Sequence, residues 1–209
     1  MVTKEKIMNI LHIDSSISGG NSVSRALSSE IVQAEKDRYP EANSVYRDLA
    51  TRPVGHLSAA HLAAAQGAVP ETLDIQNDID ESAKALDEFL TADIVVIGAP
   101  MYNFSVPSQL KAWIDRIAVA GKTFRYTANG PEGLAGDKKV IIASSRGGFY
   151  GPETPAASLD HQEGYLRAVF GFLGIKDITF IRAEGIGLGE EQRNKSIEAA
   201  KAEIHELVA

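Results

Sequence analysis

Five short segments of the chain have the apolar pattern of β-strands. Four are nearly continuous apolar runs, at residues 7–13, 92–99, 139–143 and 178–183, and a weaker fifth covers residues 44–49. Apolar runs without alternating polar positions are typical of strands that are covered on both faces, as in parallel sheets. We therefore expect a buried parallel sheet.

Between these segments, apolar residues repeat at helical spacing. Leu110, Trp113, Ile114 and Ile117 follow the i, i+3, i+4, i+7 pattern. Similar apolar faces occur in residues 27–34, 79–90, 166–173 and 197–207. Because strand and helix alternate, the chain is expected to form an α/β fold. This fold is a doubly wound, five-stranded parallel sheet with helices on both faces and right-handed crossovers.

Two segments fall outside this alternation. Residues 52–70 are rich in Ala and His, and we expect a partly helical excursion there. Residues 123–136 contain Asn129-Gly130-Pro131, which is strong turn chemistry, so we expect a short hairpin or loop. The sequence shows no repeat and no linker, and we take residues 1–209 as a single domain.

Composition and charge exclude several classes of function. The chain has 21 Lys and Arg against 28 Asp and Glu, and the net charge of −7 does not favour nucleic acid or anionic membranes as partners. It has no Cys, which excludes disulfides, catalytic thiols and zinc–thiolate sites. No stretch approaches the ~18 apolar residues of a membrane span, and the N-terminal residues lack a signal-peptide run. We expect a cytoplasmic protein.

Small polar residues follow the first apolar run. Ligands of open α/β sheets bind outside the carboxyl ends of the strands. Ser16, Ser22 and Ser24 offer hydroxyl groups there, and the glycines at 19–20 let a ligand approach the backbone. With the N–H groups of the helix that follows, these residues suit a phosphate. The alternative is an ordinary helix cap at Asn21 or Ser22.

Two further strand-end loops contain aromatic rings and glycines. The loop between Pro100 and Pro107 includes a Tyr-Asn-Phe trio, and the loop after residue 143 contains Arg146 and two glycines. Taken singly, the loop with the Tyr-Asn-Phe trio could simply cover the hydrophobic core, and the loop with Arg146 could be a turn with an arginine on the surface. Together with the first loop, along one edge of the sheet, they favour a flat, phosphorylated cofactor.

Other ligand motifs are absent or weak. The fingerprint G-x-G-x-x-G is missing after the first strand, and a P-loop reading of residues 116–123 fails because Arg116 stands where the first Gly is needed. The five His residues form no cluster with ligand spacing, so we expect no metal.

We interpret His12 as a packed polar residue. Asp14 is interpreted as a cap or a contact to the cofactor edge, and Trp113 as core or subunit interface.

Three motifs in order make the chain resemble a known family. The motifs are similar to those of the FMN-dependent NADH-azoreductases, which also act as NAD(P)H:quinone oxidoreductases. They are Met101-Tyr102-Asn103-Phe104, the run TFRYTANGPEG at residues 123–133, and Ser145-Arg146-Gly147-Gly148. The resemblance extends from about residue 8 to 207. It implies a flavodoxin-like fold and active sites formed across a homodimer interface.

The resemblance also implies which residues bind the cofactor. Non-covalent FMN would be held around its phosphate by Ser16, Ser22, Val23 and Ser24. The flavin ring would be held by Met101, Tyr102, Asn103, Phe104, Ser145, Arg146, Gly147 and Gly148. Phe104, Tyr126 and Phe172 would wall the substrate pocket, some of them donated by the partner subunit.

The implied activity is electron transfer from NADH or NADPH through FMN to quinones or azo compounds, by a ping-pong mechanism. No side chain is required as an acid or base, although Arg146 is a candidate for stabilising negative charge on the ring. The rival interpretations are a flavodoxin-like FMN electron carrier without a substrate pocket and a non-catalytic protein. Residues 52–70 and 149–164 depart from the family pattern.

Overall fold

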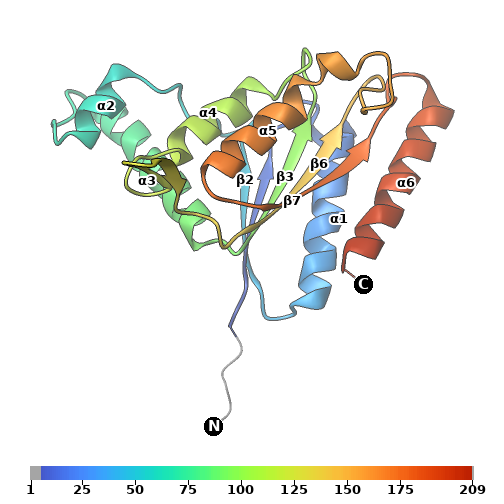
Figure 1. Cartoon of the computed structure of the whole chain (residues 1–209), viewed down its shortest axis with the longest axis horizontal. Coiled ribbons are helices and arrows are strands. Elements are labelled where there is room, and N and C mark those ends of the chain that lie inside the picture. Colours follow the sequence, from blue (N-terminus) through green and yellow to red (C-terminus); the bar gives the residue numbers. More distant parts are fainter. Residues whose placement is uncertain (1–5, 209) are drawn as a thin grey trace, which may run out of the picture.

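The computed structural model describes residues 6–208. Its centre is a five-stranded parallel sheet in the order β2-β1-β3-β6-β7, formed by β1 (Asn9–Asp14), β2 (Asn43–Asp48), β3 (Ile94–Pro100), β6 (Lys139–Ser145) and β7 (Asp177–Ala183). All neighbouring strands pair in parallel, so the carboxyl ends of the five strands share one edge of the sheet (Figure 1). The expected flavodoxin-like, doubly wound sheet is confirmed.

Helices cover both faces of this sheet (Figure 1). One face packs against α1 (Val23–Arg38) and α6 (Glu190–Val208), and the other packs against α3 (Leu73–Thr91), α4 (Ser108–Ile117) and α5 (His161–Phe172). Short 3-10 turns lie at η1 (Gly19–Asn21) and η2 (Ala157–Leu159). Within residues 6–208, no helix has the length and hydropathy needed to cross a bilayer.

The central strand β3 shows why the apolar runs lack alternation. Ile94 and Val96 pack in the cluster under α1 and α6, whereas Val95 and Ile97 pack in the cluster under α3, α4 and α5. Successive side chains of a strand point to opposite faces. Both faces of β3 are therefore core, and the strand is apolar throughout.

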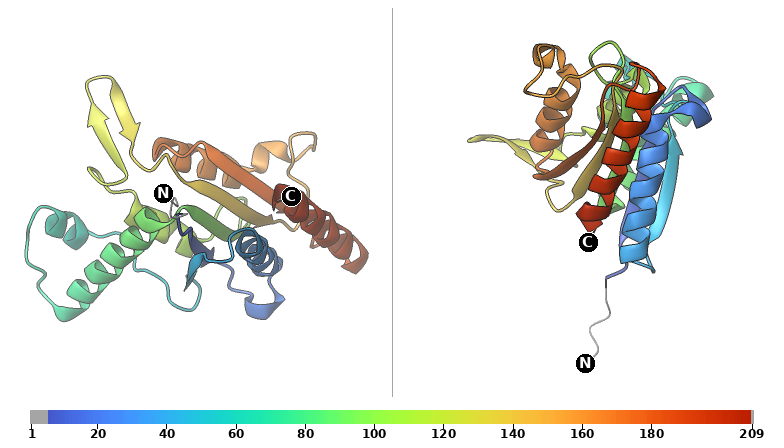
Figure 2. Two further views of the ribbon diagram at one scale, coloured as in Figure 1. Left: turned by 90° about the horizontal axis from the view of Figure 1, so that it is seen from below. Right: turned by 90° about the vertical axis from the view of Figure 1, so that its right-hand side faces the viewer.

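The two excursions also form as expected. Residues 52–70 contain one short helix, α2 (Ala59–Ala65), and residues 123–136 contain a hairpin of β4 (Phe124–Thr127) and β5 (Gly130–Gly133). The hairpin projects from the body of the molecule (Figure 2). Its base lies against the end of α5, where a Cβ on Gly133 would clash with the backbone of Leu173 and Gly174.

Candidate functional site

The three loops singled out in the sequence meet at the carboxyl edge of the sheet. Ser15 donates hydrogen bonds from its N–H (3.1 Å) and its hydroxyl (2.8 Å) to the Gly98 carbonyl. The Met101 N–H donates to the Ser145 carbonyl at 2.8 Å. These hydrogen bonds hold the starts of the three loops side by side. One ligand can therefore contact all three loops.

The first loop ends in the N-terminus of α1. Ser22 is the N-cap, and its hydroxyl accepts the Arg25 N–H at 3.3 Å and lies 3.1 Å from the Ser24 hydroxyl. The Val23 and Ser24 N–H groups belong to the first turn, which has no preceding carbonyls to bond to. Ser22 therefore caps the helix, and the N–H groups of Val23 and Ser24 are the donors that could bind an anion.

The second loop is a tight turn with an unusual backbone. Tyr102 and Ser105 exchange two N–H to carbonyl hydrogen bonds, both of 3.0 Å. Between them, Asn103 (φ 48°) and Phe104 (φ 68°) both lie in the left-handed region, and the Phe104 side chain is 42% exposed. Such strain in non-glycine residues is characteristic of functional loops.

Tyr102 joins this turn to the first loop. Its hydroxyl accepts the Ile17 N–H at 3.2 Å and lies 3.3 Å from the Ser16 hydroxyl.

The third loop contains a buried arginine. The Arg146 side chain is fully buried, and its guanidinium lies 3.0 Å from Asp160, 2.5 Å from Glu163 and 3.2 Å from Glu184. It is therefore not the surface arginine of a simple turn. Three carboxylates compensate its charge, which does not support the expectation that Arg146 stabilises a charged ring. Gly147 borders open space, since a Cβ there would meet nothing within 4 Å.

A buried hydrogen-bond chain connects Arg146 to the second loop. Arg146 Nε donates to the Ser144 hydroxyl at 3.0 Å, and that hydroxyl donates to Gln162 Oε1 at 2.7 Å. Gln162 Nε2 then donates to the Ala99 carbonyl at 3.1 Å. Sequence reasoning missed Gln162, because a polar residue near the start of a helix gives no sign that it points into the core.

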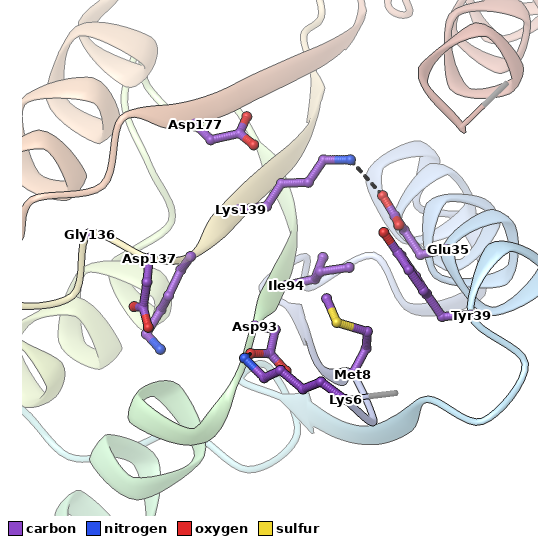
Figure 3. Close-up of a pocket in the computed structure, with 11 residues that line it drawn as sticks. Lys6, Met8, Glu35, Tyr39, Asp93, Ile94, Gly136, Asp137, Lys139 and Asp177 are labelled. Atoms are coloured by element: carbon purple, nitrogen blue, oxygen red, sulfur yellow. Dashed lines mark hydrogen bonds and ion pairs between the residues drawn. The ribbon is translucent and has the colours of Figure 1, made fainter. Parts of the chain in front are cut away.

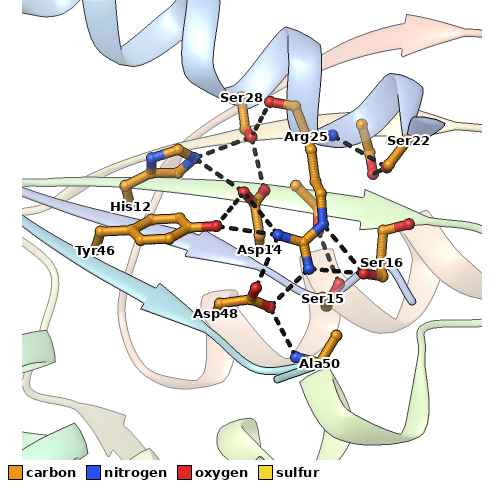
Figure 4. Close-up of polar contacts among 12 residues, drawn as sticks. His12, Asp14, Ser15, Ser16, Ser22, Arg25, Ser28, Tyr46, Asp48 and Ala50 are labelled. Atoms are coloured by element: carbon orange, nitrogen blue, oxygen red, sulfur yellow. Dashed lines mark hydrogen bonds and ion pairs between the residues drawn. The ribbon is translucent and has the colours of Figure 1, made fainter. Parts of the chain in front are cut away.

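A second polar network lies beneath the first loop (Figure 4). Buried Asp14 accepts hydrogen bonds from the hydroxyls of Ser28 (2.8 Å) and Tyr46 (3.0 Å), while His12 is buried and 3.0 Å from the Ser28 hydroxyl. Asp14 thus belongs to an internal network instead of capping a helix. Burial and the Asp14 carboxylate raise the pKa of Tyr46 to about 12, so this hydroxyl stays a donor.

The same network contains Arg25 and Asp48, which sequence reasoning also missed. Arg25 Nη2 lies 2.6 Å from Asp48 Oδ1. Burial acts to raise the pKa of Asp48, but hydrogen bonds from Arg25 and the Ala50 N–H outweigh it and hold this pKa at about 2. The available signal was positional: Asp48 ends a strand at the functional edge, and Arg25 lies three residues after the cap Ser22.

The structure does not bring the three expected pocket aromatics together within one chain. The Phe104 carbonyl accepts the N–H of His161 at the start of α5, whereas Phe172 ends that helix. A helix of 12 residues is about 18 Å long. Tyr126 packs on Phe124 (5.6 Å between ring centroids), which packs on Phe172 (4.6 Å).

Phe104 instead faces Tyr150, with 6.0 Å between ring centroids. Tyr150 belongs to the segment 149–164, for which the sequence predicts a departure from the family pattern.

Trp113 belongs to the core. It is fully buried and packs edge-on against Phe89, 5.9 Å between ring centroids. Of the two alternatives expected for Trp113, core and subunit interface, the structure supports the core, because the apolar face of α4 is covered by α3 and the sheet.

One cavity lies beside the strand-end loops, and another lies away from them. One of about 490 Å³ is lined by Tyr102, Asn103, Lys111 and Tyr165, beside the second loop. Another of about 350 Å³ lies at the opposite edge of the sheet, where Lys139 pairs with Glu35 at 2.8 Å (Figure 3). Across residues 6–208, no cluster of His, Asp and Glu has the arrangement of a metal site.

Comparisons with known proteins identify the family of the chain. The family described as flavodoxin-like fold matches residues 8–208. FMN-dependent NADH:quinone oxidoreductase 2 of Bradyrhizobium diazoefficiens is 58% identical over 92% of this chain and 95% of that protein. FMN-dependent NADH:quinone oxidoreductase of Sinorhizobium fredii is 55% identical over 95% of this chain and 96% of that protein.

Among solved structures, an azoreductase from Bacillus anthracis is 28% identical, with a TM-score of 0.86 over 97% of this chain and 99% of that one. An FMN-dependent NADH-azoreductase from the same species, in complex with FMN, is 25% identical with a TM-score of 0.85 over 97% and 98% of the two chains. The chain therefore belongs to the flavodoxin-like family of FMN-dependent NADH:quinone oxidoreductases and azoreductases.

Proposed function

We propose that this protein is an FMN-dependent NADH:quinone oxidoreductase that also reduces azo compounds, and that the whole chain forms one FMN-binding domain. The observation that carries the proposal is the meeting of three loops at one edge of the sheet, one suited to a phosphate and two to a ring. The names of relatives that share more than half of their residues with this chain support the same activity.

The residues present fit FMN. The first-turn N–H groups of Val23 and Ser24, with the hydroxyls of Ser16 and Ser22, would hold the phosphate. Met101, Tyr102, Asn103 and Phe104 would hold the ring from one side, and Ser145, Gly147 and Gly148 from the other. Arg146 has its guanidinium paired with carboxylates and its backbone N–H and carbonyl bonded to Ala183 and Ile186, so it would hold the loop and not the ring. The open space beside Gly147 leaves room for a ring to approach the backbone.

When bound, FMN would supply the two-electron redox chemistry between the nicotinamide and the acceptor. The chain binds, orients and encloses the reactants, and we assign no side chain as an acid or base. The Gly147 and Gly148 carbonyls are occupied by N–H groups of Gly187 and Gly185. We assign the polar contacts to the ring edge to the N–H groups of Gly147 and Gly148 rather than to the Arg146 guanidinium.

The substrate pocket requires two chains. Phe104 lies at the start of α5, whereas Tyr126 is joined through Phe124 to Phe172 at the end of that helix. A pocket walled by all three would therefore combine residues of two subunits. Tyr126 is 76% exposed at the projecting hairpin, as expected for a residue that a partner covers. We therefore propose a homodimer whose sites each use the Phe104 loop of one subunit and the hairpin of the other.

The donor is NADH or NADPH, and the acceptor is a quinone or azo compound. Both reactants are flat and need the same position, with reacting atoms about 3–3.5 Å apart, so the donor leaves before the acceptor enters. This is a ping-pong mechanism. We place the enzyme in the cytoplasm, which supplies reduced nicotinamide.

Two measurements on the purified protein test the function. Mass spectrometry of the released chromophore is expected to show FMN, and FAD alone would contradict the assignment. Initial rates of NADH oxidation at several fixed quinone concentrations are expected to give parallel double-reciprocal lines. Bound FMN without NADH oxidation would identify an electron carrier, and a protein without bound flavin would contradict the function altogether.

A further inference from the structure

We infer that Arg25 is a positioning residue that clamps the phosphate loop to the end of β2, and that this clamp gives the site its preference for a phosphorylated flavin. The inference rests on the proposed function, since it concerns how the FMN phosphate is selected. An arginine in the first turn of α1, beside a phosphate loop, would ordinarily be read as a direct phosphate ligand. The geometry contradicts that reading.

The guanidinium has no donor left for a phosphate. Nε and Nη2 donate to the Ser16 carbonyl at 3.1 and 2.8 Å. Nη1 and Nη2 donate to the Asp48 carboxylate at 3.0 and 2.6 Å, and Nη1 also donates to the Tyr46 hydroxyl at 3.0 Å. Since arginine has five N–H donors, these hydrogen bonds use all of them.

The positive charge of Arg25 is also compensated by two carboxylates, those of Asp48 and Asp14. The Asp48 carboxylate forms a two-pronged ion pair with it, and buried Asp14 lies 3.7 Å from Nη1. Two carboxylates against one guanidinium leave no positive field for an anion, so the phosphate has to be held by N–H groups and hydroxyls.

The clamp fixes the loop at Ser16. Arg25 holds the Ser16 carbonyl, while the Ser16 hydroxyl accepts the Ser18 N–H at 3.3 Å and lies 3.3 Å from the Tyr102 hydroxyl. Asp48 is anchored in turn by the Ala50 N–H at 3.0 Å. The ring loops start from β3 and β6 instead, so a loosened clamp disturbs the phosphate contacts more than the ring contacts.

The test is the selectivity of the holoenzyme for FMN over riboflavin, which has the same ring without the phosphate. Equilibrium dialysis against mixtures of the two flavins gives the ratio bound to wild type, Asp48→Asn, Arg25→Lys and Arg25→Gln. Glu198→Gln, which breaks the exposed pair with Lys201, is the matched control.

We expect Asp48→Asn and Arg25→Gln each to lower the FMN-to-riboflavin preference about tenfold, because each removes charge-assisted hydrogen bonds of the clamp. Riboflavin affinity and Glu198→Gln are expected to stay at the wild-type level. Arg25→Lys is not expected to restore the preference, since an ammonium cannot reproduce the planar fork.

The direction in which Asp48→Asn changes the FMN-to-riboflavin preference distinguishes a clamping role of Arg25 from a role as direct phosphate ligand. If Arg25 were a direct phosphate ligand, removing its carboxylate partner would free it and strengthen the FMN preference, and a preference that is unchanged or stronger overturns the clamp. Equal losses of FMN and riboflavin affinity would show a merely structural effect and also overturn it. A wild-type protein that binds no flavin would instead contradict the proposed function.

Discussion

Phe104 is held in a backbone conformation that glycine adopts more easily than any other residue. Its φ of 68° and the φ of 48° at Asn103 are imposed by the paired hydrogen bonds of Tyr102 and Ser105. The Phe104 side chain in this turn is partly exposed and faces Tyr150. Strain and exposure at the same residue fit a side chain used for binding.

This strain predicts an unusual order of stability. The free energy of unfolding of Phe104→Gly is expected to exceed that of Phe104→Ala by about 1 kcal/mol, because only glycine relieves the strain of the left-handed backbone. The glycine variant should therefore unfold at a higher urea concentration. Both variants lose the ring, so both are expected to raise the KM for quinone. An alanine variant as stable as the glycine variant would contradict the strain.

Asp48 predicts a pH dependence of stability. Its pKa is lowered to about 2 in the folded protein, against an ordinary value of 3.8. A carboxyl group with a lowered pKa stabilises the folded state above its unfolded pKa, and this contribution is lost as the pH falls from about 5 to 2. The contribution at neutral pH is of order 2 kcal/mol.

The measurement is the free energy of unfolding of wild type and Asp48→Asn from pH 7 to pH 2. The gap between them is expected to narrow steadily below pH 5. A gap that stays constant down to pH 2 would show that the Arg25–Asp48 pair does not contribute in this way.

Among the elements, the strands were the most predictable from sequence, because each central strand has core on both faces and is apolar throughout. The strand-end loops followed from topology. The environment of Arg146 was not predictable, because its three carboxylates come from residues 160, 163 and 184, and nothing local pairs them with it. The burial of Trp113 depended likewise on which helix packs against α4.

The base of the hairpin packs on the residues that follow α5, through a contact between Gly133 and Gly174. A Cβ on Gly133 would clash with the backbone of Leu173 and Gly174, whereas a Cβ on Gly171 of α5 would meet nothing within 4 Å. Gly133→Ala is therefore expected to lower stability by about 1–3 kcal/mol, through forced backbone shifts. Thermal unfolding measures this effect.

Gly171→Ala is the matched control. It is expected to be neutral or stabilising by about 0.5–1 kcal/mol, because in the last turn of α5 alanine loses less conformational entropy on folding than glycine does. Equal effects of the two substitutions would mean that the base of the hairpin is not packed tightly.

For the whole molecule, the separation of Phe104 from Tyr126 predicts complementation between subunits. In the proposed dimer, Phe104→Ala and Tyr126→Ala each damage every site of their own homodimer. A mixed dimer has one site with both changes and one site with neither. After subunit exchange at equal ratio, activity with quinone is expected to recover to about a quarter of wild type.

The control mixes each variant with itself, which should recover nothing. Mixed variants that show no gain, although light scattering confirms that they have exchanged subunits, would place both residues in the same subunit's site.

The proposed function requires one flavin that receives electrons from NADH and passes them to an acceptor at the same place. The most direct test follows the visible spectrum of the purified protein without oxygen. NADH alone is predicted to bleach the flavin absorbance, and quinone added afterwards is predicted to restore it without further NADH. A flavin that NADH alone leaves unbleached would contradict the proposed function.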